Sequence, residues 1–495
     1  MSTILGISAG FHDAALSVID TNGDILYAGH SERYSKTKND PTLDSNMVQT
    51  VLGTYQPNHF AFYERPWMHN WQQLRSGQRA FGPWRTSSAI EQALGLDVDG
   101  DVDFSSYQHH LSHAAAGFQT SALDWSAVVV IDAIGEMDTI SIYRAWYDRA
   151  GVAHYDRLWR QTYPNSIGLF YSAVTDRVGL KPMEDEYILM GMAGWGDPDR
   201  AEEIAGSMEQ IFLLDELSFN TNFHIGMSKM YFARHTDMDI AAGAQLFTER
   251  LINRVMTKAR ALTKCENLVY MGGVALNCVA NSKLDMWKNI WIMPNPGDAG
   301  SSLGAAALRY GKRLNWQNAY LGTDIQGEYP VENVIQELHT RKIVGVANGR
   351  AEFGPRALGN RSLLADPRGD AIKDQVNEIK RRQKFRPFAP AILEEHVHDY
   401  FNMPANMGTS PYMQTVAGVR DPKSFPAITH IDGTARVQTV ANDGSGFRQL
   451  LEQWYTETGC PMLLNTSLNI KGEPIVNDRS DADRFAKHYG VNVFS

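Results

Sequence analysis

The chain has 495 residues, of which 43% are hydrophobic and 21% charged, and its formal net charge is −10 at pH 7. This length predicts two or more domains of an ordinary globular protein, and the negative charge disfavours broad binding to nucleic acid. The lack of an apolar run of about 18 residues excludes a membrane span, and three widely spaced cysteines exclude a disulfide framework and favour a reducing cytoplasm.

Short strands dominate the predicted start of the chain. Residues 3–9 and 14–20 are predicted to form two strands joined by a tight turn, and residues 25–30 a third. Because this start alternates like strands and lacks a basic segment, we expect no signal peptide. The order of apolar strand, Gly-containing loop and second strand returns at residues 126–132 and 139–143. This weak repeat is what two related α/β lobes facing each other across a cleft would leave in a sequence.

A histidine pair lies between the two repeats, in the segment His109-His-Leu-Ser-His113. On a helix, the first and last of these imidazoles lie on one face, one turn apart. With Asp132 at the end of a predicted strand, they form a candidate site for a divalent metal. Such a pair is common by chance. A zinc protease would need Glu directly after the first His, where this chain has His110, so that interpretation is not supported.

The middle of the chain contains a candidate phosphate site. A long helix is predicted for residues 241–262, then a strand at 267–271 and the segment Gly272-Gly-Val-Ala-Leu-Asn277. A Gly pair between a strand and a helix lets the backbone approach a phosphate, although such pairs are common. A second strand at 290–295 leads to Asp298, which could face the same cleft. Neither the Rossmann nor the P-loop motif occurs, so neither site is supported.

A second domain is predicted after the polar stretch 321–330, beginning with a strand at 343–347. Residues 330–495 hold 20 basic and 19 acidic side chains, so all of the net negative charge belongs to the first part. Guanidinium, ammonium, hydroxyl and amide donors gather in four of its segments and could hold a small polyanion. Each segment alone is more often structural. The segments are 349–362, with Arg350, Arg356 and Arg361; 380–390; 434–436; and 465–469.

Ordered motifs along nearly the whole chain carry a resemblance to a known family. The motifs are Gly10–Ala15, Glu32-Arg33, His109–His113, Ser166–Tyr171, Met190–Ala193, Gly272–Asn277, Gly297–Gly300, Gly349–Arg368, Lys380–Pro390, Thr434–Arg436 and Asn465–Pro474. With them the chain resembles the O-carbamoyltransferases of nodulation-factor and antibiotic biosynthesis. The resemblance implies an α/β fold in two parts. Residues 1–328 would form a duplicated actin/sugar-kinase-like domain similar to the tRNA threonylcarbamoylation protein. Residues 329–495 would form an α+β domain similar to threonylcarbamoyl-AMP synthase.

The resemblance also implies a chemistry. Carbamoyl phosphate and ATP would form carbamoyl-adenylate in the second domain, and an acceptor hydroxyl would attack it in the first, releasing AMP. It implies a divalent metal, iron(II) as the native ion with Mn²⁺ or Mg²⁺ as alternatives. The implied metal ligands are His109, His113, Asp132 and Asp298. The other implied site residues are His12, Lys380 and Arg386 in catalysis, Arg356, Arg436, Ser467 and Asn469 on the co-substrates, and Gly272, Gly273 and Asn277 on the nucleotide.

Elementary chemistry agrees with this assignment. A carbamoyl carbonyl is a poor electrophile, and adenylation gives it a good leaving group. His12, with an ordinary pKa near 6.5, would take the acceptor's proton at neutral pH. Because the mixed anhydride hydrolyses in water, we expect a closed path between the domains. One departure from the family is Ile188, where many relatives carry Lys.

Two other functions remain open on the sequence alone. A small-molecule kinase of the same superfamily would use the first domain but leave the basic segments of the second unexplained. A non-catalytic nucleotide-binding or scaffold protein is the third hypothesis. For the carbamoyltransferase we expect a small-molecule hydroxyl acceptor of sugar, antibiotic or nucleoside type, no membrane partner, a cytoplasmic location and a homodimer as one oligomeric state.

Overall fold

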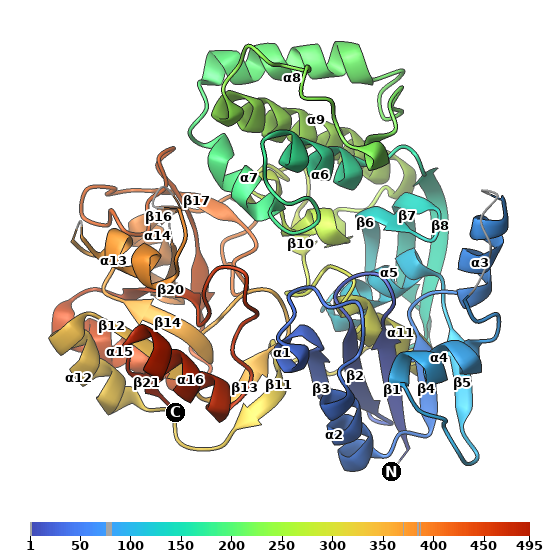
Figure 1. The fold of residues 1–495 in the computed structure, drawn as a ribbon, viewed down its shortest axis with the longest axis horizontal. Helices are drawn as coiled ribbons and strands as arrows, with labels where there is room; N and C mark the ends of the chain where they lie inside the picture. Colours follow the sequence, from blue (N-terminus) through green and yellow to red (C-terminus); the bar gives the residue numbers. More distant parts are fainter. Residues whose placement is uncertain (1, 76–81, 370, 384–385, 387) are drawn as a thin grey trace. The chain divides into compact units, whose positions relative to one another are not determined.

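A computed structural model of the protein describes residues 2–75, 82–369, 371–383, 386 and 388–495. The chain is mixed α/β (Figure 1) and divides into two compact units. Unit 1 comprises Met1–Ser31 and Asn39–Gln317, and unit 2 comprises Glu32–Lys38 and Asn318–Ser495. Across the described residues, no helix has both the length and the apolar character needed to cross a bilayer.

The division between the units falls earlier than the expected boundary between residues 328 and 329. The stretch 321–330, expected to be a polar connection, begins instead within strand β11 (Tyr320–Ile325). This strand pairs antiparallel with β13 (Gly349–Glu352), a strand of unit 2. Pairing with a distant strand, which local composition does not reveal, therefore assigns this stretch to unit 2.

Unit 1 contains two five-stranded sheets with the same topology. The first has the order β3-β2-β1-β4-β5 and the second β8-β7-β6-β9-β10. In each, the first three strands are antiparallel and the last two run parallel to the central strand. The predicted strand–loop–strand repeats are β1–β2 and β6–β7. The strand bounds are β1 Thr3–Ser8, β2 Ala15–Asp20, β3 Ile25–His30, β4 His59–Phe62, β5 Asp103–Ser106, β6 Trp125–Gly135, β7 Asp138–Tyr147, β8 Ala153–Thr162, β9 Asn267–Met271 and β10 Asn289–Trp291.

Two helices lie between these sheets. Helix α5 (His109–Thr120) packs on β6 and β9, helix α11 (Gly300–Tyr310) packs on β1 and β2, and the helices pack on each other. Small residues make this close packing possible. A Cβ atom on Gly304 of α11 would lie 1.8 Å from the backbone oxygen of Ser112 in α5. The packing therefore holds α5, which carries the histidine pair, in a fixed position against α11.

We predict that Gly304→Ala destabilises the protein by about 1–3 kcal/mol or more, because overpacking forces α5 and α11 apart. Gly206→Ala is the matched control, since a Cβ atom there meets nothing within 4 Å and the residue lies inside helix α8 (Pro198–Phe212). There, alanine should be neutral or stabilising by up to about 1 kcal/mol. Urea unfolding of the two variants checks this. Equal stabilities would contradict the close contact.

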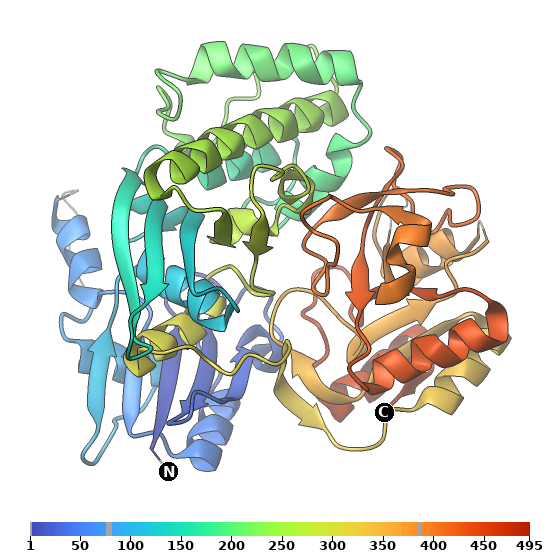
Figure 2. The same ribbon diagram turned by 180° about the vertical axis from the view of Figure 1, so that it is seen from behind.

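The remaining helices of unit 1 pack on the sheets or on one another. Helices α6 (Ile167–Arg177) and α9 (Asp237–Thr263) contact β6, and α8 packs along α9 (Figures 1 and 2). The predicted helix 241–262 lies inside α9, which starts earlier because Thr236 caps it, accepting a hydrogen bond from the backbone of Asp239. The other helices are α2 Ser45–Tyr55, α3 Pro66–Arg75, α4 Thr86–Leu94, α7 Glu186–Ala193, η1 Phe223–Ile225, η2 Gly273–Leu276 and α10 Cys278–Asn281.

Unit 2 is built on a six-stranded sheet of order β19-β15-β20-β14-β12-β21. In its core, apolar residues of this sheet pack against helices α12 (Val331–Arg341) and α15 (Gly446–Thr458). The strands are β12 Ile343–Ala347, β14 Arg361–Ala365, β15 Ala389–Leu393, β19 Gln438–Val440, β20 Met462–Ser467 and β21 Val493–Phe494, with a small sheet of β16 Phe401–Asn402, β17 Val416–Val419 and β18 Thr434–Arg436. The helices are α12 Val331–Arg341, α13 Ala371–Ile379, η3 Glu394–His396, α14 Val397–Tyr400, α15 Gly446–Thr458 and α16 Arg479–Tyr489.

A short segment from the start of the chain completes unit 2. Helix α1 (Glu32–Ser35) and the next three residues, to Lys38, belong to the same compact unit as Asn318–Ser495. The buried guanidinium of Arg33 donates to the backbone oxygen of Gly354 at 2.9 Å, and Lys36 forms an ion pair with Asp481. Unit 2 is therefore assembled from two separate stretches of sequence.

Candidate active site

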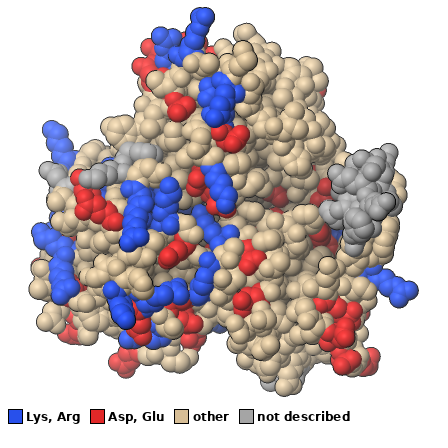
Figure 3. Space-filling model, viewed as in Figure 1, with Lys and Arg blue, Asp and Glu red and all other residues tan. Residues whose placement is uncertain are grey.

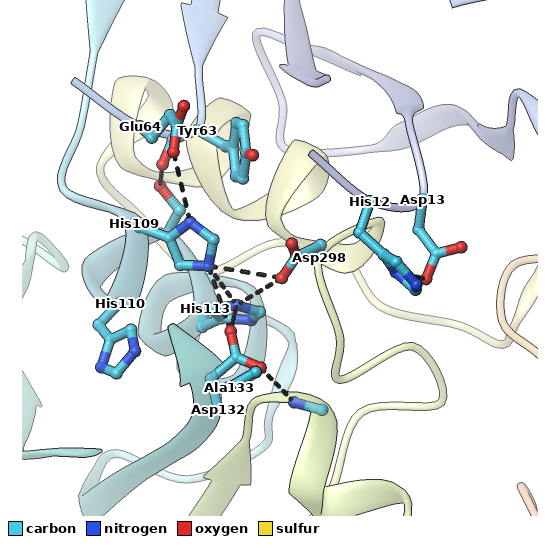
Figure 4. A network of polar contacts seen from close by, with 12 residues as sticks. His12, Asp13, Tyr63, Glu64, His109, His110, His113, Asp132, Ala133 and Asp298 are labelled. Carbon is cyan, nitrogen blue, oxygen red and sulfur yellow. Dashed lines mark hydrogen bonds and ion pairs between the residues drawn. The ribbon is translucent and has the colours of Figure 1, made fainter. Parts of the chain in front are cut away.

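Four side chains of unit 1 converge on one point (Figure 4). His109 and His113 come from the first turns of α5, Asp132 from β6, and Asp298 from the loop before α11. The Nε2 atoms of the two histidines lie 3.0 Å apart. Each of these nitrogens lies 3.3–3.5 Å from one carboxylate oxygen of Asp132 and one of Asp298. The structure thus brings together all four residues expected as metal ligands.

The spacing of these four atoms fits a bound cation. Metal bonds of about 2.0–2.2 Å place neighbouring ligand atoms about 3.0–3.5 Å apart in octahedral or tetrahedral geometry. Burial lowers the pKa of His109 and of His113, but Asp298 and Asp132 outweigh it and raise both values. Burial raises the pKa of Asp132, but the two imidazoles outweigh it and lower the value. The two carboxylates thus favour positive charge at this buried point, and a divalent ion bound there would supply that charge in place of protons.

Neighbouring groups fix which atoms face the centre. His113 Nδ1 donates to the backbone oxygen of Pro296 at 3.1 Å, so Nε2 is the ring nitrogen that faces the centre and could bind a metal. The backbone N–H of Gly273 donates to Asp132 Oδ1 at 3.2 Å, so the other carboxylate oxygen faces the histidines. Gly272 has φ +90°, and a Cβ atom there would lie 2.2 Å from the backbone oxygen of Ile131. The Gly pair therefore positions the carboxylate of Asp132, a candidate metal ligand.

The helices that follow the Gly pair are short. The chain forms only the short helices η2 and α10, so the pair does not precede a long helix whose N-terminus could hold a phosphate. Asn277 exchanges two hydrogen bonds of 3.0 and 3.1 Å with Gln245 of α9, and its side chain also caps Ala280. Nucleotide contacts by Gly272, Gly273 and Asn277 remain a prediction. Gln245, which the sequence did not single out, holds Asn277 in place.

Two residues that sequence reasoning missed lie against His109. Tyr63 and Glu64 directly follow strand β4, and the ring centres of Tyr63 and His109 are 5.0 Å apart. Glu64 Oε2 lies 3.7 Å from His109 Nδ1. Burial raises the pKa of the Glu64 carboxyl, and the neighbouring His109 opposes the shift. The sequence feature that could have indicated these two residues is β4, a short apolar strand that ends just before them, beside the four converging side chains.

His12 lies near the centre but is not the neutral base that its ordinary pKa predicts. Its Nδ1 lies 2.9 Å from Asp13 Oδ2, and its Nε2 lies 3.1 Å from the backbone oxygen of Met183. Burial lowers the pKa of His12, but the bond to Asp13 and the charges of Asp13 and Asp298 raise it to about 10. In this arrangement the ring is protonated at neutral pH and donates from both nitrogens.

A second cluster lies in unit 2 around Lys380, which follows helix α13. Its buried ammonium donates to the backbone and side-chain oxygens of Ser467 and Asn469, at 3.1 Å to Ser467 Oγ and 2.9 Å to Asn469 Oδ1. Burial, followed by the nearby charges of Arg382 and Arg386, lowers the pKa of Lys380 well below its usual value. Four of the residues expected to bind the co-substrates, Lys380, Arg386, Ser467 and Asn469, thus lie in one neighbourhood. Figure 3 shows Lys and Arg side chains gathered over unit 2.

Hydrogen bonds of two buried side-chain amides, Asn465 and Gln438, connect the other segments that were expected to bind the co-substrates. Asn465 of β20 donates to the backbone oxygen of Ala357 and to the side chain of Gln438, and Gln438 donates to the backbone oxygen of Leu358. These bonds tie together the segments that carry Arg356, Arg436 and Ser467. The Nε of Arg436 is buried and has no hydrogen-bond partner among the described residues.

At least two arginines between residues 349 and 362 are bound to the protein itself. Arg361 is fully buried and donates to the backbone oxygens of five residues. These acceptors are Thr323, Asn348, Gly349, Asn360 and Asn477. Arg350 donates to the backbone oxygen of Leu321 at 2.6 Å. The expectation that all three bind an anion is therefore wrong for Arg361, because five carbonyl groups already surround its guanidinium.

Comparison with known proteins adds independent information. Two family models match the chain, Carbamoyltransferase N-terminus over residues 83–307 and Carbamoyltransferase C-terminus over residues 335–495. Nodulation protein NolO of Bradyrhizobium diazoefficiens is 34% identical, over 76% of this chain and 75% of the relative. The 3'-hydroxymethylcephem-O-carbamoyltransferase of Amycolatopsis lactamdurans is 29% identical, over 97% and 96%. Protein sll1178 of Synechocystis sp. is 33% identical, over 98% and 94%.

The similarity to solved structures is weak. HypF from T. kodakarensis has a TM-score of 0.36 and 14% identity, covering 62% of this chain and 48% of that chain. Full-length HypF in its phosphate- and nucleotide-bound form has a TM-score of 0.34 and 13% identity, covering 62% and 55%.

Proposed function

Because the chain belongs to the carbamoyltransferase family, we propose that it is an ATP-dependent O-carbamoyltransferase that works through a carbamoyl-adenylate. The observation that carries the proposal is the presence of one polar cluster in each unit. Unit 2 holds the buried Lys380 with Ser467 and Asn469, and unit 1 holds four convergent side chains that could bind a metal. A kinase would have no use for the Lys380 cluster.

Activation is assigned to unit 2. Carbamoyl phosphate would lose inorganic phosphate to water, and an oxygen of the resulting carbamate would attack the α-phosphorus of ATP and expel pyrophosphate. Every reactant and product of this step is anionic, which explains the concentration of Lys380, Arg382 and Arg386 in one place. The bonds from Lys380 to Ser467 and Asn469 already use the donors of its ammonium group, so Lys380 would act on the anions through its positive charge and by holding these two residues in place.

Transfer to the acceptor is assigned to unit 1. The oxygen of an acceptor alcohol would attack the carbamoyl carbon, and the bond to the phosphate oxygen would break to release AMP. A divalent ion held by His109, His113, Asp132 and Asp298 would supply positive charge for the phosphate oxygens of the nucleotide. Two imidazole donors favour iron(II) or manganese(II) over magnesium, which prefers oxygen ligands and water.

Proton transfer from the acceptor is assigned to the pair His12 and Asp13. At neutral pH the ring of His12 holds a proton on each nitrogen, because its pKa is raised to about 10. It can accept the acceptor's proton only after passing one of its own to Asp13, 2.9 Å away, or to solvent. The pair therefore acts as one unit, and Asp13 is as necessary to it as His12.

The decisive experiment incubates the purified protein with ATP, carbamoyl phosphate, Mn²⁺ or Fe²⁺ and a panel of sugar, cephem and nucleoside alcohols. We expect AMP, pyrophosphate and inorganic phosphate, and a carbamoylated acceptor whose mass rises by one carbamoyl group. Formation of ADP and a phosphorylated acceptor would instead identify a kinase. Absence of any nucleotide turnover with every acceptor and both metals would contradict the proposal.

A further inference from the structure

The hydroxyl group of Tyr63 is buried without a partner. The side chain is 0% exposed, and its oxygen forms no hydrogen bond with any described residue. The ring itself is firmly packed, with its centre 5.0 Å from that of His109 and 5.4 Å from that of Phe62. A buried polar group without a partner is rare in folded proteins and often indicates a missing ligand or water.

This hydroxyl lies within electrostatic reach of the four-residue centre formed by His109, His113, Asp132 and Asp298. The carboxylates of Glu64, Asp298, Asp132 and Glu136 all act on it electrostatically. In Figure 4 the hydroxyl lies on the side of the ring away from Glu64, toward Asp298 and His12. Although these four carboxylates act on the hydroxyl electrostatically, it donates a hydrogen bond to none of them. Its hydrogen is therefore available to a group that enters the centre.

We propose that Tyr63 is a further catalytic residue, whose hydroxyl donates a hydrogen bond to an α-phosphate oxygen of the nucleotide bound at the four-residue centre. The inference rests on the proposed function, since it takes the adenylate as the ligand of this centre. No covalent bond to Tyr63 forms and its proton stays on the phenol oxygen. When the bond between carbamoyl carbon and phosphate oxygen breaks, negative charge grows on the phosphate, and a fixed donor stabilises it.

The test compares Tyr63→Phe with Tyr270→Phe. Both tyrosines are fully buried, and neither hydroxyl has a hydrogen-bond partner among the described residues. Burial alone raises the pKa of the Tyr270 hydroxyl, and no charge of a described residue adds to the shift. Both variants keep the aromatic ring and lose one unbonded hydroxyl. Tyr270→Phe therefore reports the effect of that loss away from the centre.

We expect Tyr63→Phe to lower kcat for AMP release on the order of 100-fold. It should also weaken the binding of AMP to the Mn²⁺-loaded protein about tenfold, the low end for a hydrogen bond to a charged group. Its Mn²⁺ affinity and its Tm without ligands should equal those of the wild type. Tyr270→Phe should match the wild type in every measurement.

Three results would overturn the inference. The first is an unchanged AMP affinity and kcat in Tyr63→Phe, which would mean that the hydroxyl meets only water. The second is a parallel loss of Tm or Mn²⁺ affinity, which would indicate a structural role. The third is an equal loss in Tyr270→Phe. If the wild type itself gives no AMP from ATP and carbamoyl phosphate, the proposed function fails, and the AMP titration alone still decides the role of Tyr63.

Discussion

Replacing His113 with glutamine is expected to weaken Mn²⁺ binding by more than about 100-fold and to stop carbamoyl transfer. Loss of a residue behind a metal ligand already costs about 10- to 100-fold in affinity, and His113 provides a ligand atom itself. Its Nε2 lies 3.3 Å from Asp298 and 3.5 Å from Asp132, and glutamine cannot place an aromatic nitrogen at that position. Calorimetric titration with Mn²⁺, together with the release of AMP in the presence of acceptor, measures both effects.

His110→Gln is the matched control on the same helix. His110 is also fully buried, but its Nδ1 lies 2.8 Å from Ser141 Oγ and the residue is not among the four converging side chains. Glutamine there can still bond to Ser141, so metal affinity should stay within a few-fold of the wild type. Equal losses at positions 110 and 113 would mean that damage to α5, and not loss of a ligand, explains the result.

Replacing Lys380 with methionine is expected to abolish the formation of carbamoyl-adenylate, while His12→Ala spares this step and blocks transfer. Methionine has a similar length but no charge, so it removes the ammonium that binds Ser467 and Asn469. Pyrophosphate release from ATP and carbamoyl phosphate measures the first step. Carbamoylation of the acceptor measures the second.

Lys373→Met controls for the loss of a lysine from α13, the helix that precedes Lys380. Lys373 is half-buried, and burial also lowers its pKa, but no contact joins it to Ser467 or Asn469. It should release pyrophosphate at the wild-type rate. If Lys380→Met and His12→Ala failed at the same step, the division of labour between the two units would be wrong.

Periodicity and local motifs were sufficient for part of the fold. Alternating apolar residues located β1, β2, β3 and β12, and the repeated strand–loop–strand pattern located β6 and β7. Strand β11 was missed because its polar and glycine residues resemble a linker, and only its pairing with β13 makes it a strand. Such pairing depends on residues far along the chain, which a local pattern does not include.

The candidate site shows the same limit. The histidine pair is visible in the sequence because both residues lie on one helix. The raised pKa of His12 is not, because it depends partly on Asp298 and on the backbone of Met183, far along the chain. Arg361 looked like an anion ligand from its type and neighbours. Its five backbone acceptors come from separate segments, so only the folded structure shows that its donors are already used.

The contribution of residues 32–38 to unit 2 constrains how this protein can be taken apart or recombined. A gene fragment that starts at Asn318 would encode unit 2 without Arg33, Tyr34 and Lys36, whose partners are Gly354, Thr323 and Asp481. Exchanging the C-terminal half between homologues would likewise pair one parent's α1 with the other parent's sheet. A workable chimera or a separately expressed activating half must carry both stretches from the same parent, joined by a designed linker.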